Sequence, residues 1–105
     1  MNLVRKFGDI CDVKHCYYKG EDGYKEDALI VSVAFEDTER PNSGKCLSYD
    51  LIIIDKNSSG YLSWHIINER LKYDTINFYI AGLCVCNYAE IVPYEQMDDF
   101  YKKML

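Results

Sequence analysis

The chain has 105 residues, of which 49% are apolar, and this length and composition suit one folded domain and exclude low-complexity disorder. Its 17 acidic and 12 basic residues give a formal net charge of −5, which disfavours direct binding to the phosphate backbone of DNA or RNA. No apolar run approaches the roughly 18 residues of a membrane span. We therefore expect a single compact domain over residues 1–105 that binds neither nucleic acid nor a membrane directly.

The cysteine pattern predicts a reducing compartment. The chain has an odd number of cysteines, five in all. The segment from Met1 to Asp9 contains Arg5 and Lys6 and lacks the apolar stretch of about 7–15 residues that a secretory signal needs. We expect free thiols and a cytoplasmic location.

The first half of the chain predicts three strands, over Ile10 to Tyr18, Ala28 to Glu36 and Cys46 to Asp55. Each alternates its side chains with a period of two. The third is apolar on both faces near its end, as a central strand would be. Connections of about nine residues are too short for a crossover helix, so we expect an antiparallel meander.

The second half predicts mainly helix, with one ambiguous segment. An apolar row at helical spacing indicates a helix from about Gly60 to Tyr73. The segment from Thr75 to Val92 is rich in β-branched and aromatic residues, which favours a strand bent at Gly82. The same residues could instead form a buried helix capped by Asp74.

A final helix is expected to begin at Pro93, because proline suits the first helical position. Its apolar stripe would comprise Tyr94, Met97, Tyr101 and Met104. The predicted fold is α+β: an antiparallel sheet of about four strands in β-β-β-α-β-α order, with two helices packed on one face.

Candidate reactive groups do not form a recognisable motif. Cys84 and Cys86 would share a face of a strand, but the spaced ligand pairs of a structural zinc site are missing. Cys11 and His15 lack an identifiable third group that would orient a catalytic dyad. We expect no catalytic residue, metal or cofactor. A small Cys/His-dependent enzyme or a metal- or ligand-binding domain is the alternative. For a metal site, Cys46, Cys11 or His15 would have to join Cys84 and Cys86 from other strands, and the sequence leaves open whether Cys11, Cys46, Cys84 and Cys86 converge.

The predicted binding site is the first loop and its flanks. The chain has ten tyrosines, and two of them flank a loop rich in acidic residues. Tyrosine supplies large contact area at binding hot spots, and acidic groups attract a basic partner. The predicted partner-binding residues are Tyr18, Glu21, Asp22, Tyr24, Glu26 and Asp27.

These features predict a small, acidic, non-enzymatic inhibitor that binds and blocks a basic partner protein. The partner could be a nucleic-acid-binding enzyme, because such enzymes carry basic surfaces. Toxin-immunity proteins and viral anti-defence proteins, such as anti-CRISPR proteins, are functional classes of this size and charge. A homodimer joined through an apolar sheet edge or the C-terminal helical stripe is a further possibility.

Overall fold

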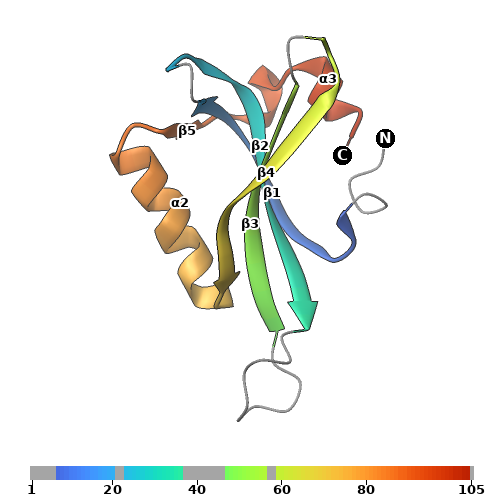
Figure 1. Ribbon diagram of the computed structural model, residues 1–105. Helices are drawn as coiled ribbons and strands as arrows, with labels where there is room; N and C mark the ends of the chain where they lie inside the picture. Colours follow the sequence, from blue (N-terminus) through green and yellow to red (C-terminus); the bar gives the residue numbers. More distant parts are fainter. Residues whose placement is uncertain (1–6, 21–22, 37–46, 57–58, 105) are drawn as a thin grey trace.

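Five antiparallel strands form one twisted sheet (Figure 1). The computed structural model describes residues 7–20, 23–36, 47–56 and 59–104. The strands are β1 (Ile10–Lys19), β2 (Lys25–Glu36), β3 (Leu47–Lys56), β4 (Leu62–Leu71) and β5 (Ala89–Ile91). Their spatial order is β4-β3-β2-β1-β5, so β3, β2 and β1 lie inside the sheet and β4 and β5 form its edges.

Four helical elements follow β4 in the chain. The main helix α2 (Ile76–Val85) comes after the 3-10 turn η1 (Tyr73–Thr75). The turn η2 (Tyr94–Gln96) and the short helix α3 (Asp99–Lys102) follow β5. Within the described residues, no helix has the length and apolarity that crossing a membrane requires.

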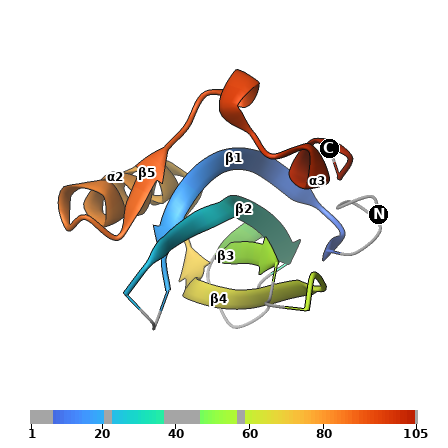
Figure 2. The ribbon, with the colours of Figure 1, turned by 90° about the horizontal axis from the view of Figure 1, so that it is seen from above.

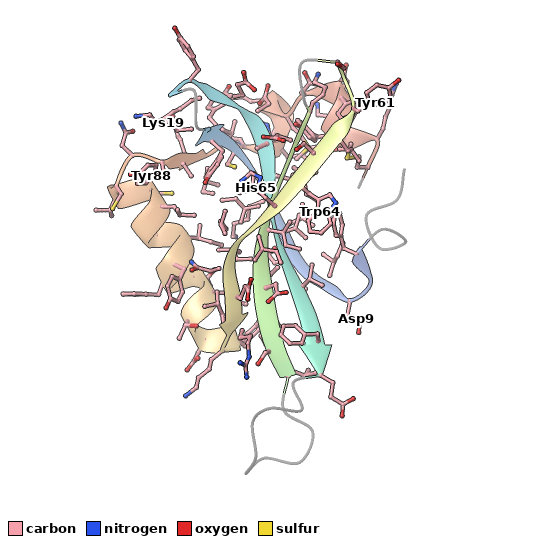
Figure 3. The ribbon with its side chains drawn as sticks, in the orientation of Figure 1. Asp9, Lys19, Tyr61, Trp64, His65 and Tyr88 are labelled. Carbon is pink, nitrogen blue, oxygen red and sulfur yellow. The ribbon has the colours of Figure 1, made fainter. Side chains whose placement is uncertain are left out.

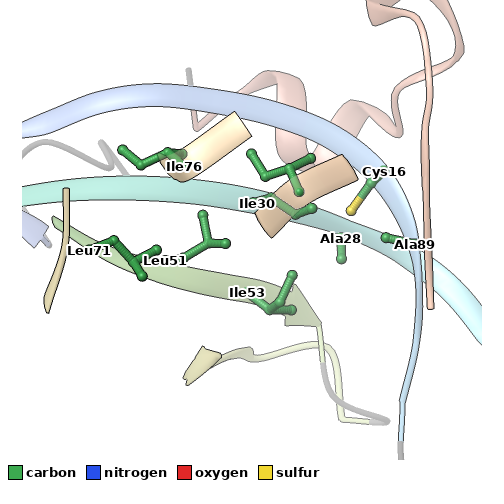
Figure 4. Packing of buried hydrophobic residues seen from close by; sticks show 9 residues of the cluster. Cys16, Ala28, Ile30, Leu51, Ile53, Leu71, Ile76 and Ala89 are labelled. Atoms are coloured by element: carbon green, nitrogen blue, oxygen red, sulfur yellow. The ribbon is translucent and has the colours of Figure 1, made fainter. Parts of the chain in front are cut away.

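Alternating residues of the central strands build two separate cores. On one face of the sheet, Ile30 and Ile53 pack with Ile76 and Ile80 of α2 (Figure 4 shows this cluster). On the other face, Leu29 and Val31 of β2 pack under the C-terminal segment. That second core contains Leu29, Val31, Ile52, Ile54, Met97, Tyr101 and Met104. Side chains of opposite parity point to opposite faces of a strand, which is why an uninterrupted apolar run is needed here.

The predicted α+β class, the antiparallel sheet and the first three strands are confirmed. The third strand is interior, as its two apolar faces predicted, and residues 51–54 are all buried. Cys46, the predicted first residue of this strand, lies outside the described residues.

The helix predicted from Gly60 to Tyr73 is wrong, because this segment contains strand β4. Two β-bulges interrupt the alternation of apolar and polar residues along β4. Leu51 pairs with Asn68 while Ile52 pairs with Ile66, so Ile67 is an extra residue on β4. A second irregularity follows at Arg70, whose φ of 56° is in the left-handed region. Each bulge shifts the alternation by one residue, and the resulting apolar spacing imitates a helix.

The strand preferred for Thr75 to Val92 is also wrong over most of its length, and the helical alternative is observed for Ile76–Val85. Ile76 and Ile80 are spaced by four and bury one side of α2 against the sheet. The cap position is Thr75, which makes no side-chain capping hydrogen bond, and not Asp74. Asn87, at a φ of 63°, reverses the chain after the helix so that β5 can pair with β1.

The predicted C-terminal helix is divided into η2 and α3, and it does not share a face with α2. Met97 has extended backbone angles, and the Asp98 side chain then caps α3 by accepting from the Phe100 N–H at 2.8 Å. Met97 and Tyr101 belong to one core while the α2 residues belong to the other, so the two helices pack on opposite faces (Figure 2). Both faces of the central strands are apolar, so a separate element must bury each face.

Candidate functional site

A surface hollow of about 820 Å³ lies at the end of the sheet where the β1–β2 hairpin projects. We call it the tyrosine hollow. It is lined by Tyr18, Lys19, Gly20, Tyr24, Glu26, Ala28, Asp55, Ser63, His65 and Tyr88. The lining residues come from strands β1 to β4, from the β1–β2 hairpin turn and from the turn that follows α2.

Strand register brings these side chains to the α2 face of the sheet. Tyr18 is paired with Glu26, and Asp55 is paired with both Ala28 and Ser63. His65 is paired with Ile53, which belongs to the core under α2. Paired residues on one face have neighbouring Cβ atoms, so carboxylate, imidazole and phenol groups gather over the end of this core. Figure 3 labels Lys19, His65 and Tyr88, which reach the region from three separate elements.

Aromatic rings form much of the wall. The Tyr18 and His65 rings lie with their centroids 6.2 Å apart and tilted by 51°. Tyr24 and Tyr88 are 74% and 51% exposed, so both phenols remain accessible to a partner. Exposed phenol faces favour stacking and cation contacts.

Two carboxylates contribute negative charge at different depths. Glu26 is exposed, whereas Asp55 is half-buried. Burial raises the pKa of Asp55, and the nearby His65 partly opposes this rise. Burial also raises the pKa of Tyr18, and the neighbouring Asp55 adds to the increase. A carboxylate that has lost part of its hydration gains from an incoming positive group.

Hydrogen bonds join the hairpin to the turn after α2. The Lys19 N–H donates to the Tyr88 carbonyl at 2.8 Å, and Lys25 Nζ donates to Asn87 Oδ1 at 2.7 Å. The hairpin turn is closed by the Gly23 N–H, which donates to the Gly20 carbonyl at 3.0 Å. Gly23 has a φ of 84°, a conformation that side chains disfavour. These contacts position two walls of the hollow before any partner binds.

The structure brings together three of the six predicted site residues: Tyr18, Tyr24 and Glu26 all line the hollow. Glu21 and Asp22 lie outside the described residues. Asp27 is on the opposite face, where its Oδ1 lies 2.8 Å from Nε2 of the buried His15. Its backbone carbonyl also accepts a hydrogen bond of 3.0 Å from the Tyr101 hydroxyl. Asp27 therefore stabilises the second core and does not line the hollow.

Sequence reasoning missed Asp55, Ser63, His65 and Tyr88 as members of this site. Asp55 has the same parity as Ile53, which was a usable signal for its face. Ser63 and His65 lie in the segment for which the sequence predicts a helix, and a helix would not pair with β3. Tyr88 reaches the hairpin only because α2 and the turn at Asn87 return the chain to β1.

The four cysteines in the described residues are distributed over the α2 face and the surface, and Cys46 lies outside those residues. Cys16 is buried, and this burial, with Cys84 and Asp27 nearby, raises its pKa to about 12. Cys84 lies within α2, and Cys86 follows the helix, so the two do not share a strand face as predicted. Cys11 is exposed at a β-bulge, and His15 pairs with Asp27. Among the residues described, no three His, Cys, Asp or Glu side chains are grouped to hold a metal ion.

Comparison of the chain with protein-family models, with curated proteins and with solved structures gives no significant match.

Proposed function

We propose that this protein is an acidic inhibitor that binds a basic partner protein through the tyrosine hollow and blocks the partner's surface. One observation carries the proposal. Tyr18, Tyr24 and Glu26, which flank the acidic hairpin loop, gather with Asp55 and Tyr88 around one accessible hollow. Aromatic anchors beside negative groups are suited to a positively charged protein surface.

The net charge supports a basic partner. A chain of net charge −5 is attracted to a positive surface over distances near the Debye length, which speeds the encounter. Tyrosine then supplies contact area at low cost in conformational entropy. A basic surface that binds phosphates, as on a nucleic-acid-binding enzyme, would be occluded by this contact. Toxin-immunity proteins and viral anti-defence proteins, such as anti-CRISPR proteins, are the functional classes that this proposal includes.

The test compares two matched surface variants in capture and inhibition assays. The site variant is Tyr24→Ala with Glu26→Lys. The control variant is Tyr94→Ala with Glu95→Lys, which makes the same chemical changes at exposed residues of η2, outside the hollow. Proteins captured by the wild type are identified, purified and assayed for binding rate, salt dependence and loss of their own activity.

We expect wild type and control to bind one basic protein and to inhibit it. The site variant should bind at least about tenfold more weakly, with slower association, because a charge has been reversed in a hot spot. The proposal fails if the site variant and the control bind equally, if the captured protein stays active when bound, or if no basic protein is captured.

A further inference from the structure

We propose that the tyrosine hollow receives the guanidinium group of an arginine side chain presented by the partner. This rests on the proposed function and names the group that the site recognises. The hollow combines flat aromatic walls with carboxylates at two depths, Glu26 near the rim and Asp55 further in. A guanidinium has two flat faces and five N–H donors, so it can use both kinds of surface together.

The aromatic geometry suits a planar cation. Tyr18 and His65 are tilted by 51° with their centroids 6.2 Å apart, so they form one corner of the hollow. Tyr24 belongs to the hairpin, and Tyr88 to the turn after α2. A cation within about 6 Å of a ring centroid is attracted to the ring face, and the attraction increases when water is excluded.

The charges that line the hollow define what enters it. Its acidic groups are Glu26 and Asp55, and its basic or titratable nitrogen groups are Lys19 and His65. The Lys19 side chain lies beside the hairpin turn, because a methyl group added at Gly23 would contact Lys19 Cε at 4.0 Å. Burial raises the pKa of Asp55, as expected of a carboxyl group that has lost part of its hydration. A neutral or acidic side chain would leave it in that state.

Arginine fits better than lysine for two reasons. Its guanidinium is more weakly hydrated than an ammonium, so transfer from water into a partly enclosed site costs less. Its charge is also delocalised over a plane that stacks on phenol rings.

The experiment uses three small probes and the whole protein. The probes are Nα-acetyl-arginine amide, the uncharged isostere Nα-acetyl-citrulline amide and Nα-acetyl-lysine amide. Backbone amide NMR shifts are followed during titration. The site variant is Glu26→Gln with Asp55→Asn, and the matched control is Glu36→Gln with Asp74→Asn, at carboxylates outside the hollow.

We expect the arginine probe to shift the amides of the lining residues of β1, β2 and β4 and of Tyr88. The lysine probe should bind several-fold more weakly, and citrulline should cause no saturable shift. The site variant should raise the Kd for arginine at least about fivefold, whereas the control should leave it unchanged. Spectral dispersion of each variant verifies folding, and Tyr24→Ala provides a second, uncharged test of the wall.

The inference is overturned if citrulline binds as arginine does, if the shifts lie outside the hollow, or if both double variants behave alike. These failures differ from failure of the proposed function. If the Tyr24 and Glu26 changes abolish partner binding but the arginine probe does not bind, the proposed inhibitor function stands and the arginine pocket is refuted. If the arginine probe binds but no basic protein partner is found, the arginine pocket stands and the proposed inhibitor function is refuted.

Discussion

Asp27 and its neighbour Glu26 should differ sharply in their effect on stability, although both are acidic residues of the same strand. Asp27 contacts Nε2 of His15 at 2.8 Å, and His15 is 3% exposed. The other ring nitrogen of His15, Nδ1, is buried and has no hydrogen-bond partner among the described residues. Asp27→Ala would therefore leave both nitrogens of a buried ring unpaired. Glu26→Ala removes only an exposed side chain.

The size of the effect follows from burial. Leaving a buried polar group unsatisfied costs about 1–3 kcal/mol. The Asp27 side chain is 35% exposed and already partly hydrated, so the cost comes mainly from His15, and we expect about 1–2 kcal/mol. An exposed substitution such as Glu26→Ala should stay within about 0.5 kcal/mol. For a domain of this size, the Tm should fall by at least about 4 °C with Asp27→Ala.

Urea unfolding followed by Trp64 fluorescence gives the measurement, because Trp64 is the only tryptophan and packs edge-on to Phe7 at 5.5 Å. Asp27→Asn keeps an acceptor for the ring and should restore most of the loss. In a double-mutant cycle with His15→Leu, the two residues should couple by at least about 0.5 kcal/mol. Equal effects of Asp27→Ala and Glu26→Ala, or simple additivity with His15→Leu, would refute the reasoning.

Three further results are expected. Burial raises the pKa of Asp55, so the folded state holds the carboxyl proton of Asp55 more tightly than the unfolded chain does. The free energy of unfolding should therefore decrease as the pH rises from about 4 through the pKa of the folded state. Asp55→Asn should remove that decrease and be more stable than wild type at neutral pH in urea titrations; parallel curves would contradict this. With its pKa raised to about 12, Cys16 should resist a maleimide at pH 8 while exposed Cys11 reacts, and mass spectrometry showing equal labelling would disprove it. Tyr101→Phe removes the hydrogen bond to the Asp27 carbonyl and should cost about 0.5–1.5 kcal/mol in urea unfolding, so an unchanged midpoint would be inconsistent.

Local sequence pattern predicts some elements of this fold and not others. The sequence alone determined the α+β class and the three strands of the meander. The run from Leu51 to Ile54 is apolar at every position, and only an interior strand covered on both faces buries all of it.

Three of the six site residues predicted from the sequence line the hollow. Tyr18, Tyr24 and Glu26 were predicted because they flank an acidic turn, and they line the hollow. Asp27 looked equivalent to Glu26 in the sequence, yet neighbouring residues of a strand point to opposite faces. Its separation from the hollow depends on His15 and Tyr101, which contact it from other elements.

Only the tertiary structure decided that β4 is a strand, that α2 is a helix and that α2 and α3 cover opposite faces. Bulges at Ile67 and Arg70 disturbed the alternation of β4, and pairing with β3 overrides its apparent helical spacing. The hollow itself depends on contacts between distant segments, since Asp55 meets Ser63 through strand register and Tyr88 returns to β1 only after a helix and a turn. Such contacts are determined by packing between elements, so the local spacing of residues along the chain does not predict them.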